Sequence, residues 1–133
     1  MSWRRVTTAA AALTALAVIF FGLQFLISPG TAAASFGMDA PQGDATGYFV
    51  VKGVRDVACG TVGLILLGTG HRRALGWVLL ADAIIPIGDA IAVLTHNGSP
   101  AAAYGMHLGA AAVVVVVACL LLREARRTET VRP

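Results

Sequence analysis

The chain has 133 residues, of which 57% are hydrophobic and 13% are charged, and its formal net charge is +3. One domain accounts for this length, and the apolar fraction is well above that of soluble globular proteins. The sequence shows no basic face with interleaved aromatic residues, which argues against nucleic-acid binding. We therefore expect a single domain, residues 1–133, that crosses the cell membrane several times and has the lipid bilayer as its surroundings.

Four apolar runs, each long enough to span a bilayer, are separated by polar connections. They cover about residues 8–28, 47–68, 74–95 and 101–122. The first run has a secretory signal peptide as its alternative, because Arg4 and Arg5 precede it and small residues follow it. Its apolar stretch of about 20 residues is longer than a usual signal-peptide core, which favours a membrane span.

Three other stretches have predictions of their own. Residues 29–46 contain two prolines, three glycines and two aspartates, and we expect a loop there. Its small residues and Phe36 allow a short interfacial helix, but the periodicity is too weak to predict one. Pro86 lies near the middle of the third run and should kink that helix, because it cannot donate a backbone hydrogen bond. Residues 123–133 are charged and predict a frayed cytoplasmic tail.

The arginines predict how the chain is oriented. They fall before the first run, between the second and third runs, and after the fourth, and the two opposite connections contain none. Because arginines concentrate on the cytoplasmic side of membranes, both termini should be cytoplasmic. The predicted fold class is an all-α antiparallel bundle of four transmembrane helices.

Polar residues interrupt each apolar run. Lys52, Arg55 and Asp56 share one face of the second run, Asp82 and Asp89 share a face of the third, and Gln24 and His107 lie in the first and fourth. A charge near the middle of a spanning helix costs roughly 2.5–3.5 kcal/mol, so these residues require a protein interior or a wet cavity. Counting turns from the outer end places most of them at similar depths, which predicts one intramembrane site in the outer half of the bundle.

We assign roles within this site by chemistry. Asp56, Asp89 and His107 are the catalytic candidates, since carboxylates and imidazoles move protons. Lys52, Arg55, Asp82 and Gln24 are the ligand-binding candidates.

Each assignment has a structural alternative. Arg55 can instead pair with an aspartate of the third run and hold two helices together, and Lys52 can extend to the outer interface. The two cysteines, Cys59 and Cys119, lie at different heights and do not predict a disulfide, and no spacing typical of a metal site occurs. We expect neither a metal nor a cofactor.

Gly105 and Gly109 form a G-x-x-x-G pattern on the face of the fourth run opposite His107. If His107 points into the bundle, the two glycines face outward and can mediate a homodimer. We favour this arrangement over the reverse one.

The string GVRDVACG at residues 53–60, the stretch 73–94 and the LGAAAVVVVV that follows His107 resemble a family of small four-helix membrane proteins. This family occurs in bacteria and fungi and is catalogued only as a domain of unknown function. Its G-x-R-D pattern corresponds to Gly53, Arg55 and Asp56, its P-x-G-D-A pattern to residues 86–90, and its fourth-helix histidine to His107. The resemblance assigns any shared role to Arg55, Asp56, Asp89 and His107 rather than to Lys52 or Asp82, and implies no established activity or cofactor.

Three functions compete. The first is binding or acid–base conversion of a small amphipathic metabolite, by isomerisation, cyclisation or ring opening, with its polar end at Lys52 and Arg55. The second is an accessory membrane subunit whose charges only stabilise the fold or a partner. The third is a proton-coupled transporter, and we rank it last because polar residues become sparse below Asp82. An enzyme and a binding protein stay equally open.

Overall fold

The computed structural model describes residues 3–40 and 43–130, without the side chains of 128–130, and every regular element in these ranges is helical. The long elements are α1 (Trp3–Ile27), α3 (Gly47–Gly68), α4 (Arg72–Asp82), α5 (Ile84–Thr95) and α6 (Gly109–Thr130). The short ones are α2 (Pro29–Phe36), the 3-10 turn η1 (Gly43–Thr46) and η2 (Ala102–Leu108), which is a π-helix. The all-helical prediction is confirmed.

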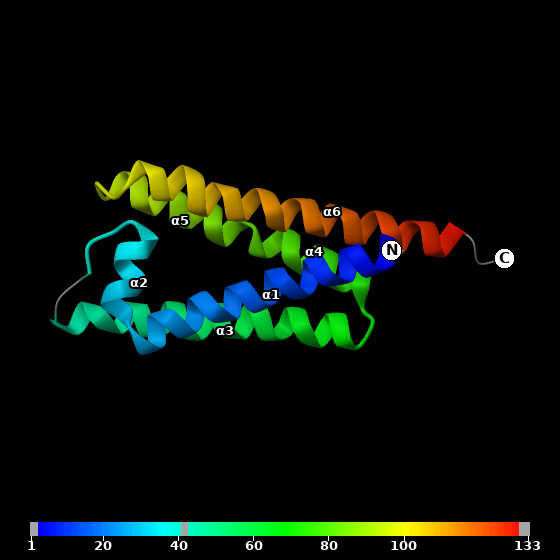
Figure 1. Ribbon diagram of the computed structural model, residues 1–133, viewed down its shortest axis with the longest axis horizontal. Helices are drawn as coiled ribbons and strands as arrows, with labels where there is room; N and C mark the ends of the chain where they lie inside the picture. The colour runs from blue at the N-terminus through cyan, green and yellow to red at the C-terminus, as the bar shows by residue number, and fades with distance from the viewer. Residues whose placement is uncertain (1–2, 41–42, 131–133) are drawn as a thin grey trace.

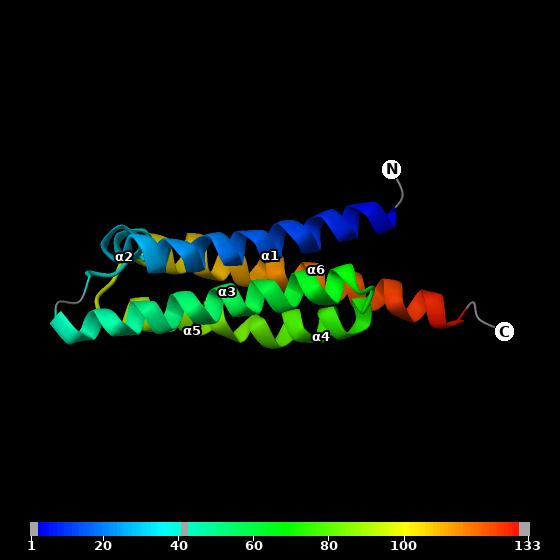
Figure 2. The ribbon, with the colours of Figure 1, turned by 90° about the horizontal axis from the view of Figure 1, so that it is seen from below.

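The elements form an elongated bundle (Figures 1 and 2). In both views α1 lies along α3, and α4 and α5 follow each other along α6. The beginning of α1, the turn between α3 and α4, and the end of α6 lie at one end of the bundle, and α2 lies at the other.

Three segments are long and apolar enough to cross a membrane: Trp3–Ile27, Arg72–Thr95 and Ala102–Arg127. The helix α3 also has 22 residues, but Lys52, Arg55 and Asp56 lower its hydropathy. The structure therefore supports a membrane protein with at least these three apolar segments, and the predicted fourth span depends on where α3 places its charges.

Glycines allow α1 and α3 to pack with their backbones close together. A Cβ atom added at Gly53 would lie 2.8 Å from the carbonyl oxygen of Gly22, and one added at Gly60 would lie 2.6 Å from that of Ala15. Small residues permit this approach between membrane helices, where packing rather than water exclusion drives association. These contacts fix the rotation of α3 and therefore decide which of its charged side chains point inward.

The prediction of a loop over residues 29–46 is wrong for Pro29–Phe36, which form α2. Proline suits the first turn of a helix because its missing N–H would have no partner there, and the alanines that follow favour helix. Gly37 ends α2 in the left-handed region, with φ of 93°, and its carbonyl oxygen accepts a hydrogen bond of 2.8 Å from the Ser99 N–H. This bond joins α2 to the turn that follows α5.

The helix that contains Pro86 breaks where the sequence predicts a kink. Between α4 and α5 the break falls at Ala83, one turn before the proline. Pro86 has no N–H to donate to the carbonyl oxygen of Asp82, so the helical hydrogen bonding is interrupted at this point.

The C-terminal tail differs from the prediction, because α6 continues to Thr130 instead of fraying after residue 122. Glu124 explains the difference, since it is bound to side chains of α1 and α4, as described below. The second and third predicted spans match the helices well, and α1 begins at Trp3, earlier than expected.

His107 is buried, with 5% of its surface exposed, whereas Gly105 and Gly109 have open space where a side chain would be. Of the two arrangements that the sequence allows, the one with His107 inward is therefore present.

The glycine packing between α1 and α3 can be tested on one helix. We expect Gly60→Ala to lower the free energy of unfolding by about 1–3 kcal/mol, because its Cβ would overlap the backbone of Ala15 and the side chain of Ile19. Gly68→Ala, where the added atom meets nothing within 4 Å, should leave stability unchanged or raise it. Unfolding in mixed micelles, followed by circular dichroism, measures both, and equal effects would contradict the proposed close packing.

Candidate functional site

A cavity of about 150 Å³ lies inside the bundle, and charged residues of several helices line it. Its polar wall consists of Thr14 from α1, Lys52, Asp56 and Cys59 from α3, Asp82 and Asp89 from α4 and α5, and His107 from η2. The rest of the wall is apolar. Two of the apolar residues, Phe21 and Ala110, are exposed, and the cavity is partly open to the surroundings of the bundle.

Lys52 is the centre of the polar wall. Its Nζ lies 3.0 Å from Asp89 Oδ2 and 3.2 Å from Asp56 Oδ2, so it joins α3 to α5. The ammonium group also lies over the rings of Phe25 and Phe36, 5.2 and 4.8 Å from their centroids, where the electron-rich faces attract a cation. The alternative in which Lys52 extends to the outer interface is therefore wrong.

Arg55 does not reach the site, although the sequence makes it a ligand-binding candidate. Its Nε and Nη2 lie 3.1 and 3.0 Å from Asp56 Oδ1, on its own helix. Its side chain is 42% exposed and is not part of the cavity wall. The structural alternative, in which Arg55 pairs with an aspartate of the third run, is also not present, because the rotation of α3 against α1 points Lys52 toward Asp89.

His107 faces the cavity, and its hydrogen bond shows which ring nitrogen is the donor. The ring Nε2 lies 2.9 Å from the backbone oxygen of Phe36. A carbonyl oxygen can only accept, so Nε2 carries the proton and donates it. In the neutral ring, Nδ1 is then the atom that can accept a hydrogen bond or a proton.

Phe36 is the site residue that the sequence reasoning did not assign. It is the last residue of α2, and it accepts the hydrogen bond of His107 while its ring contacts both His107, at a centroid distance of 4.3 Å, and Lys52. The available signal was an aromatic residue within an otherwise small and polar stretch. Recognising α2 as a helix would have directed attention to it.

Two predicted ligand-binding residues differ in their placement. Asp82 lines the cavity, and its carboxylate has no hydrogen bond or ion pair with any residue in the described part of the chain. Gln24 is half-buried on α1 but is not part of the cavity wall. The structure thus brings together Lys52, Asp56, Asp82, Asp89 and His107, and leaves Gln24 and Arg55 outside.

Within the described residues no group of three or more His, Cys, Asp or Glu side chains is arranged to hold a metal ion, and both cysteines are free. Acid–base and hydrogen-bonding groups in an apolar enclosure are the chemistry that the cavity offers. Such a wall can orient a small molecule by its polar end.

A family model described as a domain of unknown function (DUF4267) matches residues 15–121. The chain belongs to this family. Among curated proteins and among solved structures, the comparisons found no match. The family match confirms the resemblance stated from the sequence.

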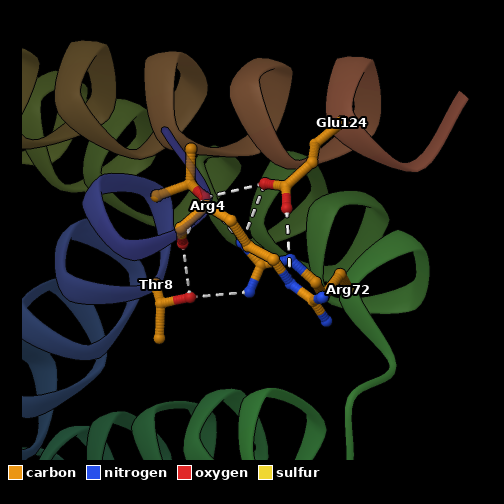
Figure 3. A network of polar contacts seen from close by, with 5 residues as sticks. Arg4, Thr8, Arg72 and Glu124 are labelled. Carbon is orange, nitrogen blue, oxygen red and sulfur yellow. Dashed lines mark hydrogen bonds and ion pairs between the residues drawn. The ribbon is translucent and has the colours of Figure 1, made fainter. Parts of the chain in front are cut away.

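The DUF4267 match contains every polar residue of the cavity wall except Thr14, but it excludes part of a second polar cluster at the other end of the bundle. Here Arg72 donates to Thr8, Thr7 and Glu124 at 2.8, 2.6 and 2.9 Å (Figure 3). Thr7, 1% exposed, also donates to Glu124 at 2.7 Å. This cluster joins α1, α4 and α6 and keeps the end of α6 helical.

The role of Lys52 as the bridge can be separated from that of Arg55 by two double-mutant cycles. We expect Lys52→Met and Asp89→Asn to couple by roughly 0.5–3 kcal/mol in the free energy of unfolding, because the two side chains are in direct contact. Arg55→Met and Asp89→Asn should be additive. Unfolding in mixed micelles measures both cycles, and coupling of Arg55 rather than Lys52 to Asp89 would contradict the observed pairing.

Proposed function

We propose that the chain is an integral membrane protein whose cavity binds a small, mostly apolar molecule by its polar end. The observation that carries this proposal is the gathering of Lys52, Asp56, Asp82, Asp89 and His107 from separate helices around one cavity inside an apolar bundle. Helices that needed only to be held together would not require an open space at the charges. Intramembrane ionisable residues of this kind commonly mark functional sites.

The size of the cavity limits its ligand. A volume of about 150 Å³ is close to that of an apolar protein cavity known to hold benzene, and below that of pockets for drug-sized ligands. A compact ring or short chain fits inside, and the exposed residues Phe21 and Ala110 give it a route from the apolar surroundings.

The charges of the wall select the polar end of the ligand. Lys52 already has two carboxylate partners, and Arg55 lies outside the cavity, so no cation is left in the wall to receive an anion. Asp82 and His107 Nδ1 are acceptors instead. The cavity therefore favours a neutral hydroxyl or a cationic amine over a carboxylate, a change from the polar end that the sequence alone predicted.

His107 supports acid–base conversion of the bound molecule as a second candidate function. Its Nε2–H is held by Phe36, so Nδ1 is positioned to remove or return a proton, as in isomerisation. Asp89 is less suited to this role than expected, because its carboxylate is paired with Lys52.

Transport across the membrane has less support. Between the cavity and the end of the bundle with Arg72, a cluster of buried apolar residues fills the interior: Ala11, Leu75, Leu79, Ala83, Val114, Val117, Ala118 and Leu121. A continuous polar path would have to pass through this cluster. An accessory subunit stays the structural alternative.

The homodimer through Gly105 and Gly109 stays a proposal. The mass of the protein in mild detergent tests it, because the Gly105→Leu, Gly109→Leu variant should have the mass of a monomer.

We test ligand binding with three probes of equal size and different charge: benzyl alcohol, benzylamine and benzoate. The alcohol and the amine should raise the melting temperature of the purified protein, since binding to the folded state stabilises it, and benzoate should not. His107→Gln should stay folded and lose the stabilisation. Ala110→Leu narrows the cavity and should weaken binding, whereas Ala112→Leu, exposed on the same helix and outside the wall, is the matched control.

If all three probes change the melting temperatures of Ala110→Leu and Ala112→Leu equally, the probes act through the detergent and the cavity is not their binding site. If His107→Gln unfolds, the polar wall is structural, and the subunit alternative gains support.

We further propose four spans with both termini cytoplasmic, with α3 as the fourth span. Its charges point to the cavity or to each other, which removes the main objection to placing α3 in a bilayer. In a variant without Cys59 and Cys119, Ser99→Cys should react with an impermeant thiol reagent in intact cells, and Gly70→Cys should react only after lysis. The reverse pattern would contradict this orientation.

A further inference from the structure

A second hollow, of about 630 Å³ and open to the surface, lies at the end of the bundle away from α2. Its wall carries Arg4, His71, Arg72, Arg73, Trp77 and Glu124. It has no residue in common with the cavity, and the ligand proposed above does not involve it.

The hollow has an excess of positive charge. Its three arginines give +3 and Glu124 gives −1, which leaves +2 with His71 neutral. Arg72 and Glu124 are bound to each other at 2.9 Å and to the threonines of α1, so these two side chains of the wall are already paired (Figure 3). Arg4 is 75% exposed, and its contact with Glu124 is a long one of 3.8 Å through Nε. Its terminal nitrogens can therefore turn toward a ligand.

The backbone adds to this charge. The helix α4 begins at Arg72, and the hollow is lined by its first residues, Arg73 and Ala74. No side chain caps these N–H groups. The first turn of a helix has unpaired N–H donors and a partial positive charge, both of which favour an anion.

Two exposed apolar side chains follow the hollow along the chain, one on α4 and one at the start of α5. Trp77 is 54% exposed and Ile84, two turns further, is 70% exposed. Tryptophan is frequent at the boundary between headgroups and hydrocarbon. A molecule with a phosphate in the hollow would therefore meet a surface suited to an acyl chain.

We propose that this hollow binds the headgroup of an anionic phospholipid, with its phosphodiester at Arg4, Arg73 and the first turn of α4 and its acyl chain along Trp77 and Ile84. Clusters of basic residues at the ends of membrane helices bind such headgroups through charge. The two exposed apolar side chains distinguish a lipid from free phosphate, which would use only the charged part of the site.

The chain contains its own reporter, because its two tryptophans are Trp3 and Trp77. In a Trp3→Phe background, the fluorescence of Trp77 should be quenched by brominated phosphatidylglycerol at lower mole fraction than by brominated phosphatidylcholine, in vesicles otherwise made of phosphatidylcholine. The ratio of the two effective mole fractions measures the preference for the anionic lipid.

Two matched double variants test where this preference arises. Arg4→Gln with Arg73→Gln removes two charges from the wall, and should reduce the preference by roughly fivefold per arginine. Arg5→Gln with Arg123→Gln removes two charges from exposed positions at the same end, outside the wall, and should retain most of it. Circular dichroism shows whether each variant is folded. If the Arg4→Gln, Arg73→Gln variant unfolds, the single variants Arg4→Gln and Arg5→Gln are compared instead, since each removes one charge.

Equal losses in the two variants would show only a general attraction to anionic membranes and would overturn the site. Equal quenching by brominated phosphatidylglycerol and brominated phosphatidylcholine would overturn the anionic lipid as the ligand. A preference for phosphatidylglycerol that persists in inorganic phosphate, compared with chloride at the same ionic strength, supports the lipid over free phosphate.

Discussion

Charges inside an apolar bundle must neutralise one another, and in this protein Lys52 meets that requirement. One ammonium group binds Asp56 on its own helix and Asp89 on α5, and Arg55 gives Asp56 a second cation, so both carboxylates that would be costly to bury are paired. The rings of Phe25 and Phe36 cover the same group from the side of α1 and α2. Four elements are thus held at one point, and the cavity lies beside it.

The sequence predicts the apolar helices well, and it predicts that several of their polar residues lie at one level of the bundle, because both depend on local features. Helix α3 begins and ends where the hydropathy and glycine pattern place it, and Asp89 and His107 line the same cavity, as counting turns suggests. The choice between Lys52 and Arg55 could not be made in this way. They are one turn apart, and the rotation that selects Lys52 comes from the close approach of Gly53 to Gly22, a contact between distant parts of the chain.

Two other features were beyond sequence reasoning for the same physical reason. The helix α2 is too short to show periodicity, and its importance arises from the hydrogen bond that Phe36 accepts from His107, 71 residues away. The charged C-terminal stretch resembles a frayed tail until Arg72 and Thr7 are seen to bind Glu124. In both cases long-range contacts hold a segment in a place in the bundle that its own composition does not reveal.

The π-helical turn at Ala102–Leu108 makes the position of His107 depend on the number of residues as well as on their kind. A π-turn contains one more residue than the α-helix that would replace it, and each residue of an α-helix rotates the chain by about 100°. A regular α-helix with the same number of residues would rotate His107 by about 100° relative to the residues before the turn, and would direct its ring away from the cavity. The extra residue of the π-turn therefore sets the direction of the ring as much as the choice of histidine does.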